Sequence, residues 1–289
     1  MNFDALIEEC WARHGDQPDA VAARLVASLA LLKTAVRIPP YARLVTHVYG
    51  EHLGRWREGV TLLEAMRAFA RGEGDADAET AITRGIATLC YAGNLAFDLA
   101  SLPMEEYIAV LAATAGALAG RHEFQRAIAA YDGALGHRVA ELPAGSPAFR
   151  ALALAGNNLA GALEEKPDRS EAEMAGMVAA AEGGLRFWKL AGGWLEEERA
   201  EYRLANSLLQ AKQPAQAAMH ARRCVELCAA HSAPVFEQFF AHAALALAQR
   251  QLGDAAGFAD ARGQALGHYA QLAPDEKSGC ETEIGRLNG

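Results

Sequence analysis

The sequence has few sheet-forming runs and little proline, whereas glycine, with 27 residues, is common. Alternating runs rich in valine and isoleucine are nearly absent, and only 10 of the 289 residues are proline. Alanine dominates instead, and alanine, leucine, glutamate, glutamine and arginine all favour helix. With 52% hydrophobic residues, the chain can also bury a substantial core. We therefore expect an all-α protein.

Cysteines are few, and features of secretion or membrane insertion are missing. The five cysteines are odd in number and scattered, so no disulfide framework is expected. The N-terminal stretch "MNFDALIEECW" lacks the basic start and the apolar core of a signal peptide. Charges interrupt every apolar run before it reaches the length of a membrane span. We expect a cytoplasmic protein with no membrane partner.

Dense clusters of lysine and arginine are also missing. The formal net charge is −9 and the pI is about 5.5. Proteins that bind nucleic acids usually carry a basic stripe that neutralises phosphates. An acidic balance disfavours both phosphate backbones and anionic membranes. We therefore expect no nucleic-acid partner.

A rhythm of small and large side chains marks the stretch "AGRHEFQRAIAAYDGAL" at 119–135. The letters "GRHEF" predict a tight turn between two helices. In the second helix Ala127, Tyr131 and Ala134 are spaced four and three residues apart, which places them on one face. Antiparallel helices need small residues where their backbones approach and bulky residues beside them. The stretch therefore predicts a helical hairpin.

The same pattern recurs along the chain. Further turns are predicted at Gly15-Asp16, Gly54-Arg55, Lys212-Gln213 and Gly253-Asp254. The first two of these turns are 39 residues apart and the last two are 41 apart. A nearly fixed period of this size indicates a solenoid of helix pairs.

These residues resemble the tetratricopeptide repeat (TPR), in its long-repeat variety. The stretches "GRHEFQRAIAAYDGAL" and "HGDQPDAVAARLVA" carry the resemblance best. It implies an α-α superhelix of about seven antiparallel hairpins in a single domain over 1–289, with 273–289 as a C-terminal cap or tail. The segment 76–103 fits the pattern least, and its apolar residues predict a buried pair of helices.

The repeat register predicts which polar residues line the inner, concave wall. Aligning first helices by their small central residues, Ala160 and Ala205, places a stripe of polar side chains on that wall. Guanidinium and carboxamide groups suit a carboxylate or an acidic peptide end. The predicted ligand-binding residues are Asn157, Asn158, Arg199, Tyr202, Arg203 and Asn206.

The stripe partly resembles the carboxylate clamp with which some tetratricopeptide proteins hold the C-terminal tail of chaperones. Asn158, Arg199 and Arg203 match three of its five polar positions, whereas the other two fall on Ala112 and Gly116. That departure argues against a chaperone tail. The alternative is that Arg199 pairs with Glu196 while Arg203 stays solvated.

Small or apolar residues are predicted beside the stripe. They either leave a groove roomy enough for a helix or an extended peptide, or let a tightly coiled stack fill the space itself. We leave both open. The positions are Ala109, Ala112, Gly116 and Ala119 on one side and Phe240, Ala243 and Leu247 on the other.

Catalytic and metal-binding patterns are weak. A zinc site built from residues 220–231 would need one helix to surround the ion, whereas structural zinc sites combine separate segments. Adjacent glutamates, as at 164–165 and 196–198, point apart on a helix and predict either solvated faces or helix starts. The remaining histidines are dispersed, and none has a partner at a spacing typical of a triad. We expect no catalytic residue, cofactor or metal; the histidines set aside are His14, His47, His52, His122, His137, His220, His231, His242 and His268.

The sequence thus favours a non-enzymatic scaffold or adaptor that binds a protein or peptide segment, with an acidic segment suited to the stripe. Two other functions are left open: a small-molecule sensor or enzyme with a pocket inside the superhelix, and a structural subunit assembled through its ends, including with copies of itself. Trp188 and Trp194 are predicted to be core residues, with a partner-binding patch as the alternative.

Overall fold

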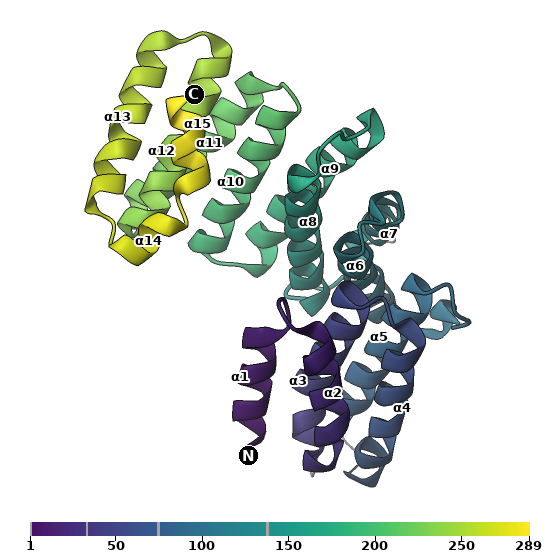
Figure 1. The fold of residues 1–289 in the computed structure, drawn as a ribbon. Coiled ribbons are helices and arrows are strands. Elements are labelled where there is room, and N and C mark those ends of the chain that lie inside the picture. Colours follow the sequence, from purple (N-terminus) through teal and green to yellow (C-terminus); the bar gives the residue numbers. More distant parts are fainter. Residues whose placement is uncertain (1, 33, 74–75, 137–138) are drawn as a thin grey trace. The chain divides into compact units, whose positions relative to one another are not determined.

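The computed structural model describes residues 2–32, 34–73, 76–136 and 139–289 (Figure 1). These residues form fifteen α-helices joined by short turns, and they contain no strand. No helix in the described part of the chain is long and apolar enough to cross a membrane. The expected all-α class is confirmed. His137 lies outside the described residues.

The chain divides into two compact units, residues 1–155 and residues 156–289. The division falls inside one helix, α8 (Pro147–Glu165). Each unit is described by itself below. The expectation of a single domain over 1–289 stays a prediction.

The first unit is a series of helices that pack mainly on their neighbours in sequence. Helix α5 packs against α3, α4 and α6, and α6 packs against α7. A π-helical turn, η3 (Val48–His52), follows α3 directly. The helices are α1 (Phe3–Arg13), α2 (Pro18–Ser28), α3 (Ile38–His47), α4 (Trp56–Glu73), α5 (Ala76–Ala92), α6 (Met104–Gly120), α7 (Phe124–Gly136) and the first part of α8.

The second unit repeats the hairpin arrangement. Each helix from α9 to α12 packs on the next one, and α10 also contacts α12, the first helix of the following hairpin. A capping box begins helix α9. The side chain of Ser170 accepts a hydrogen bond from the backbone amide of Glu173, and the side chain of Glu173 accepts one from the backbone amide of Ser170. The helices are the rest of α8, then α9 (Glu171–Ala191), α10 (Trp194–Gln210), α11 (Pro214–Ala230), α12 (Val235–Leu252), α13 (Ala255–Gln271), α14 (Pro274–Ser278) and α15 (Glu281–Asn288).

The turns and the small residues lie where the repeat pattern predicts them. The predicted turns at Gly15, Gly54, Lys212 and Gly253 each fall between two successive helical elements. Ala127 and Ala217 are fully buried. Gly59 is buried so tightly that an added Cβ would lie 2.6 Å from Leu89 Cδ1 and 2.8 Å from Tyr49 Cβ. The small residues therefore mark close helix contacts.

The segment 76–103 differs from its prediction. It contains one helix, α5, followed by a loop with a short 3-10 turn at Leu99–Ser101, not a pair of helices. Asn94 lies two residues after Ala92, the last residue of α5. Its φ of 51° is in the left-handed region. A left-handed residue stops an α-helix, so the apolar run beyond Ala92 continues as a loop.

The C-terminal segment 273–289 is helical and packed. Helix α15 lies beside α12 within the second unit (Figure 1), and the two helices are in contact. Arg262 on α13 donates to the carbonyl oxygen of Leu287 at 3.1 Å and to Asn288 Oδ1 at 2.7 Å. The side chain of Leu287 is buried. The segment therefore covers the last hairpin.

Candidate functional site

A pocket in the second unit is lined by three first helices of successive hairpins: α8, α10 and α12. It encloses about 230 Å³. On α10 the lining residues form two pairs spaced four residues apart, Glu198 with Tyr202 and Arg199 with Arg203. All four therefore lie on one side of the helix. The lining residues are Asn157, Glu198, Arg199, Tyr202, Arg203, Glu237 and Phe240.

Both arginines of the pocket pair with glutamates on neighbouring first helices. Arg199 donates to Glu237 Oε1 on α12, and this bond raises the pKa of the guanidinium. The Arg199 side chain is still 60% exposed. Arg203 pairs with Glu164 Oε2 on α8 at 2.5 Å and is 30% exposed. Both guanidinium charges are therefore locally offset by carboxylates.

Glu164 is held from two sides. Besides Arg203, it accepts a hydrogen bond of 2.6 Å from Ser207 Oγ on α10. Burial nevertheless raises the pKa of its carboxyl, against the opposing effect of Arg203. The expectation of a solvated face at 164–165 is wrong for Glu164, whose side chain is only 9% exposed, because α10 packs over it.

Glu198 is the more deeply buried of the two buried acids that line the pocket, at 1% exposure. Among the residues that the structure describes, no nitrogen or oxygen is hydrogen-bonded to either of its carboxyl oxygens. The thiol of Cys228 offers a weak bond. Burial, and secondly the nearby charge of Glu237, raise the pKa of Glu198 to about 8. The carboxyl is therefore mainly protonated at neutral pH, and the expectation of a solvated face at 196–198 is wrong for it.

The C-terminal helix α15 engages two of the predicted ligand-binding residues. The hydroxyl of Tyr202 donates to Glu283 Oε1 at 2.9 Å. Arg286 Nη1 donates to Asn206 Oδ1 at 2.9 Å, while the amide nitrogen of Asn206 donates to the carbonyl oxygen of Tyr202. Asn206 is buried and does not line the pocket. Its contacts hold α15 against α10.

The structure thus brings four of the six predicted residues together: Asn157, Arg199, Tyr202 and Arg203. Asn158 is exposed next to the pocket and accepts a 3.3 Å bond from Asn157 Nδ2. The alternative in which Arg203 stays solvated is wrong, because Glu164 pairs with it.

Three glutamates that pair with or lie beside the arginines were not among the predicted site residues: Glu164, Glu198 and Glu237. Glu164 and Glu198 lie on the same first helices as the predicted stripe, α8 and α10, and Glu198 directly precedes Arg199. Glu237 lies on the next first helix, α12. Their positions in the repeat register could have identified them. Their burial could not be read from the sequence, because it depends on contacts between hairpins.

The histidines and cysteines at 220–231, which a zinc site on one helix would use, have other partners within the second unit. His220 Nδ1 contacts Glu201 Oε2 at 2.5 Å. His231 stacks on Trp194 with ring centroids 4.8 Å apart. Cys224 and Cys228 are buried in one apolar cluster. Trp188 is buried as predicted, whereas Trp194 is partly buried.

The small residues expected to line a groove are mostly buried. Ala109, Ala112 and Ala119 are at most 5% exposed, as are Ala243 and Leu247. The two sides of the expected groove lie in different units, so both alternatives stay predictions. Phe240 does line the pocket.

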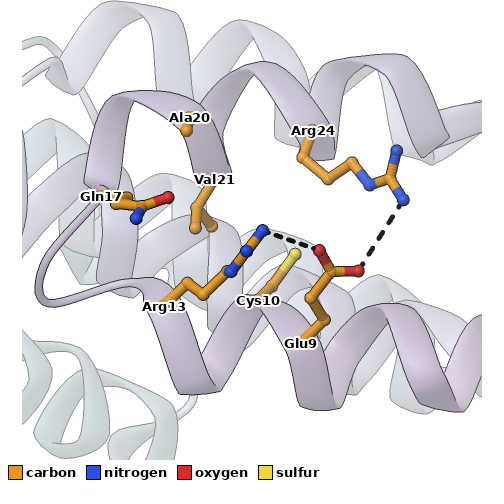
Figure 2. Close-up of a pocket in the computed structure, with 7 residues that line it drawn as sticks. All are labelled: Glu9, Cys10, Arg13, Gln17, Ala20, Val21 and Arg24. Carbon is orange, nitrogen blue, oxygen red and sulfur yellow. Dashed lines mark hydrogen bonds and ion pairs between the residues drawn. The ribbon is translucent and has the colours of Figure 1, made fainter.

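A second cavity of about 230 Å³ lies within the first hairpin, between α1 and α2 (Figure 2). Its polar groups pair with one another: Glu9 bridges Arg13 at 3.1 Å and Arg24 at 3.8 Å. Burial raises the pKa of the Cys10 thiol, so it stays protonated and is a weak nucleophile. All of its wall comes from one hairpin, and we do not assign it a ligand.

Comparison with known proteins supports the fold. No known family profile matches the sequence, and no curated protein matches it. A solved structure from Podosopora anserina, assigned as a kinesin light chain with nearly identical TPR-like repeats, matches with 15% sequence identity and a TM-score of 0.50. The match covers 80% of this chain and 96% of that one. The chain therefore has the fold of TPR-like helical repeats.

Proposed function

We propose that the chain is a non-enzymatic scaffold that holds a segment of another protein at the pocket between α8, α10 and α12. One observation carries the proposal: three successive first helices converge on one small pocket that contains a buried carboxyl without a strong hydrogen-bond partner. A buried polar group of this kind gains free energy when a ligand supplies the missing bond.

The size of the pocket favours a side chain over a whole metabolite. Pockets for drug-sized ligands usually enclose about 300–1,000 Å³. The 230 Å³ available here is below that range and suits one side chain of a bound polypeptide. This comparison favours the scaffold over a small-molecule sensor.

The chemistry of the pocket suits an acidic side chain or a chain terminus. Asn157 offers an amide, and Arg199 offers a guanidinium that is more exposed than that of Arg203. Glu198, kept neutral by its raised pKa, donates a hydrogen bond to a carboxylate and does not repel it. Asn158 extends the polar surface at the exposed edge. Tyr202 and Asn206 position α15 beside the pocket.

The first experiment identifies the segment. A photo-crosslinking residue replaces Asn158, which is exposed beside the pocket, and crosslinked peptides are sequenced by mass spectrometry from the host cell. The same crosslinker at Arg222 on the second helix α11 is the control. The proposal expects a peptide with an acidic residue or its C-terminus at the crosslink, captured from position 158 and not from position 222.

The second experiment titrates that peptide against Arg199→Ala. Loss of one charge-assisted hydrogen bond costs about 1.5–3 kcal/mol, which corresponds to a roughly tenfold to hundredfold weaker Kd. Arg223→Ala is the matched control, because Arg223 is a comparably exposed arginine that pairs with Glu197 on α10. Equal affinity of the parent and Arg199→Ala would refute the assignment of this pocket.

A further inference from the structure

Three histidines that are far apart in the sequence meet in the first unit. His14 follows the end of α1, His47 is the last residue of α3, and His52 ends the π-helical turn η3. One ring nitrogen from each lies within 4.8 Å of the other two. The ring centroids are 4.8–4.9 Å apart in all three pairs. The imidazoles therefore surround one common point.

The π-helical turn explains how His47 and His52 come together. Residues five apart on a regular α-helix differ in direction by about 140°, since each residue turns by about 100°. Here the amide of Leu53 bonds the carbonyl oxygen of Val48 at 3.1 Å, the i→i+5 bond of a π-helix. Single π turns of this kind occur frequently at functional sites.

In two of the three rings the Nδ1 atom already makes a hydrogen bond. His47 Nδ1 donates to Glu51 Oε1 at 3.0 Å, and His14 Nδ1 donates to the carbonyl oxygen of Trp11 at 2.5 Å. These bonds assign the proton to Nδ1 in both rings and leave both Nε2 atoms unprotonated. A histidine that binds a metal nearly always donates its other N–H to a carboxylate or a carbonyl in this way.

The spacing of two of the three ring nitrogens, those of His47 and His52, fits a small tetrahedral ion. Zn–N bonds of about 2.0–2.1 Å place two tetrahedral ligands roughly 3.3 Å apart. His47 Nε2 and His52 Nε2 are 3.2 Å apart. In the free protein His52 donates to His47 at this contact. When an ion binds His52 Nε2, this proton moves to Nδ1 of the same ring, so the imidazole stays neutral.

The surroundings hold the rings in place without closing the site. Trp11 packs against His14 and His47, with ring centroids 5.1 Å away in both cases. Arg121 donates to the carbonyl oxygen of His52 at 2.7 Å and fixes that end of the turn. The His47 side chain is still 22% exposed, which gives an ion and a water access.

We propose that His14, His47 and His52 form a site for one divalent ion of the Zn²⁺ type, bound through three neutral imidazoles with water in the fourth position. Zinc sites with three protein ligands and an open position are typical of exchangeable or catalytic zinc. Glu51 acts as a positioning residue that holds the His47 ring. This site lies within residues 1–155 and is independent of the proposed peptide pocket.

The test is a metal titration of the full chain, without a histidine tag and after treatment with a chelator. Co²⁺, which replaces Zn²⁺ and gives visible d–d bands, is the probe. We expect bands of a four-coordinate ion that saturate at one equivalent per chain and disappear when Zn²⁺ is added. Absence of saturable binding by the parent would overturn the proposal, whatever the variants do.

Variants locate the site. His47→Ala removes a ligand and should abolish the bands, while Glu51→Gln should weaken binding by about 10–100-fold, as is usual for a residue that orients a ligand. His242→Ala is the control, because His242 is also part-buried and contacts a second imidazole, that of His268 at 5.1 Å. Far-UV circular dichroism verifies that each variant is folded. Binding by His47→Ala and Glu51→Gln equal to that of the parent would also overturn the proposal.

Discussion

Glu198 shows how a single buried side chain links stability to pH. Its pKa is raised from 4.5 to about 8, first by burial and second by Glu237. A carboxyl with a raised pKa in the folded state binds its proton more tightly when the chain is folded. The raised pKa therefore stabilises the folded state below about pH 4.5, and this stabilisation is lost progressively as the pH rises towards 8. Arg199 opposes the shift only in part.

We predict that Glu198→Gln flattens this pH dependence. Between pH 5 and pH 8 the parent should lose stability relative to the variant by about 1.4 kcal/mol per pH unit at most. Urea unfolding of both proteins at several pH values measures the difference. Glu197→Gln is the control, because Glu197 is a neighbouring glutamate that pairs at the surface with Arg223. A constant difference between parent and Glu198→Gln across this range would contradict the raised pKa.

At the scale of elements, glycines inside helices have two different roles. Gly59 in α4 is where α4 approaches Leu89 of α5 and Tyr49 of η3. Gly263 in α13 is exposed, and no described side chain or distant backbone atom lies within 4 Å of the position of an added Cβ. Alanine is a better helix former than glycine by about 1 kcal/mol in both cases, so packing decides the sign.

We predict opposite effects for the two alanine substitutions. Gly59→Ala should destabilise the protein, because overpacking of about 1–3 kcal/mol outweighs the gain in helix propensity. Gly263→Ala should stabilise it by up to about 1 kcal/mol. Urea unfolding of the two variants beside the parent tests this pair. Equal stability of the two variants would show that α4 does not approach α5 and η3 closely.

At the scale of the whole molecule, the buried residues form separate clusters. One large cluster spans residues between Phe3 and Cys90, and a smaller one joins Cys224, Cys228, Ala233 and Ala241. In repeat folds each hairpin is stabilised chiefly by its neighbours, so a local defect has a local effect.

We therefore predict that Gly59→Ala changes hydrogen exchange only near its own cluster. Amides of α3, α4 and α5 should exchange faster than in the parent, whereas amides of α11 and α12 should keep their rates. Hydrogen–deuterium exchange with mass spectrometry resolves these peptides. A uniform rise across both clusters would indicate that the chain opens as one cooperative unit.

Features that depend on residues close together in the chain could be predicted from the sequence alone. The helical class, the turns at Gly15, Gly54, Lys212 and Gly253, and the burial of Ala127 and Ala217 follow from propensity and spacing over fewer than about forty residues. The repeat register also placed four of the six predicted residues in one pocket, because first helices of successive hairpins pack side by side.

Contacts between distant segments, and one local exception to the helical pattern, could be seen only in the folded structure. The pairing of Arg203 with Glu164, the burial of Glu198 and the contact of α15 with Tyr202 each join separate hairpins, and spacing along the chain does not encode them. The left-handed residue Asn94 ends α5 where composition predicted more helix. His14 meets His47 and His52 only because α1 packs on α3 and a π turn replaces the regular helical period.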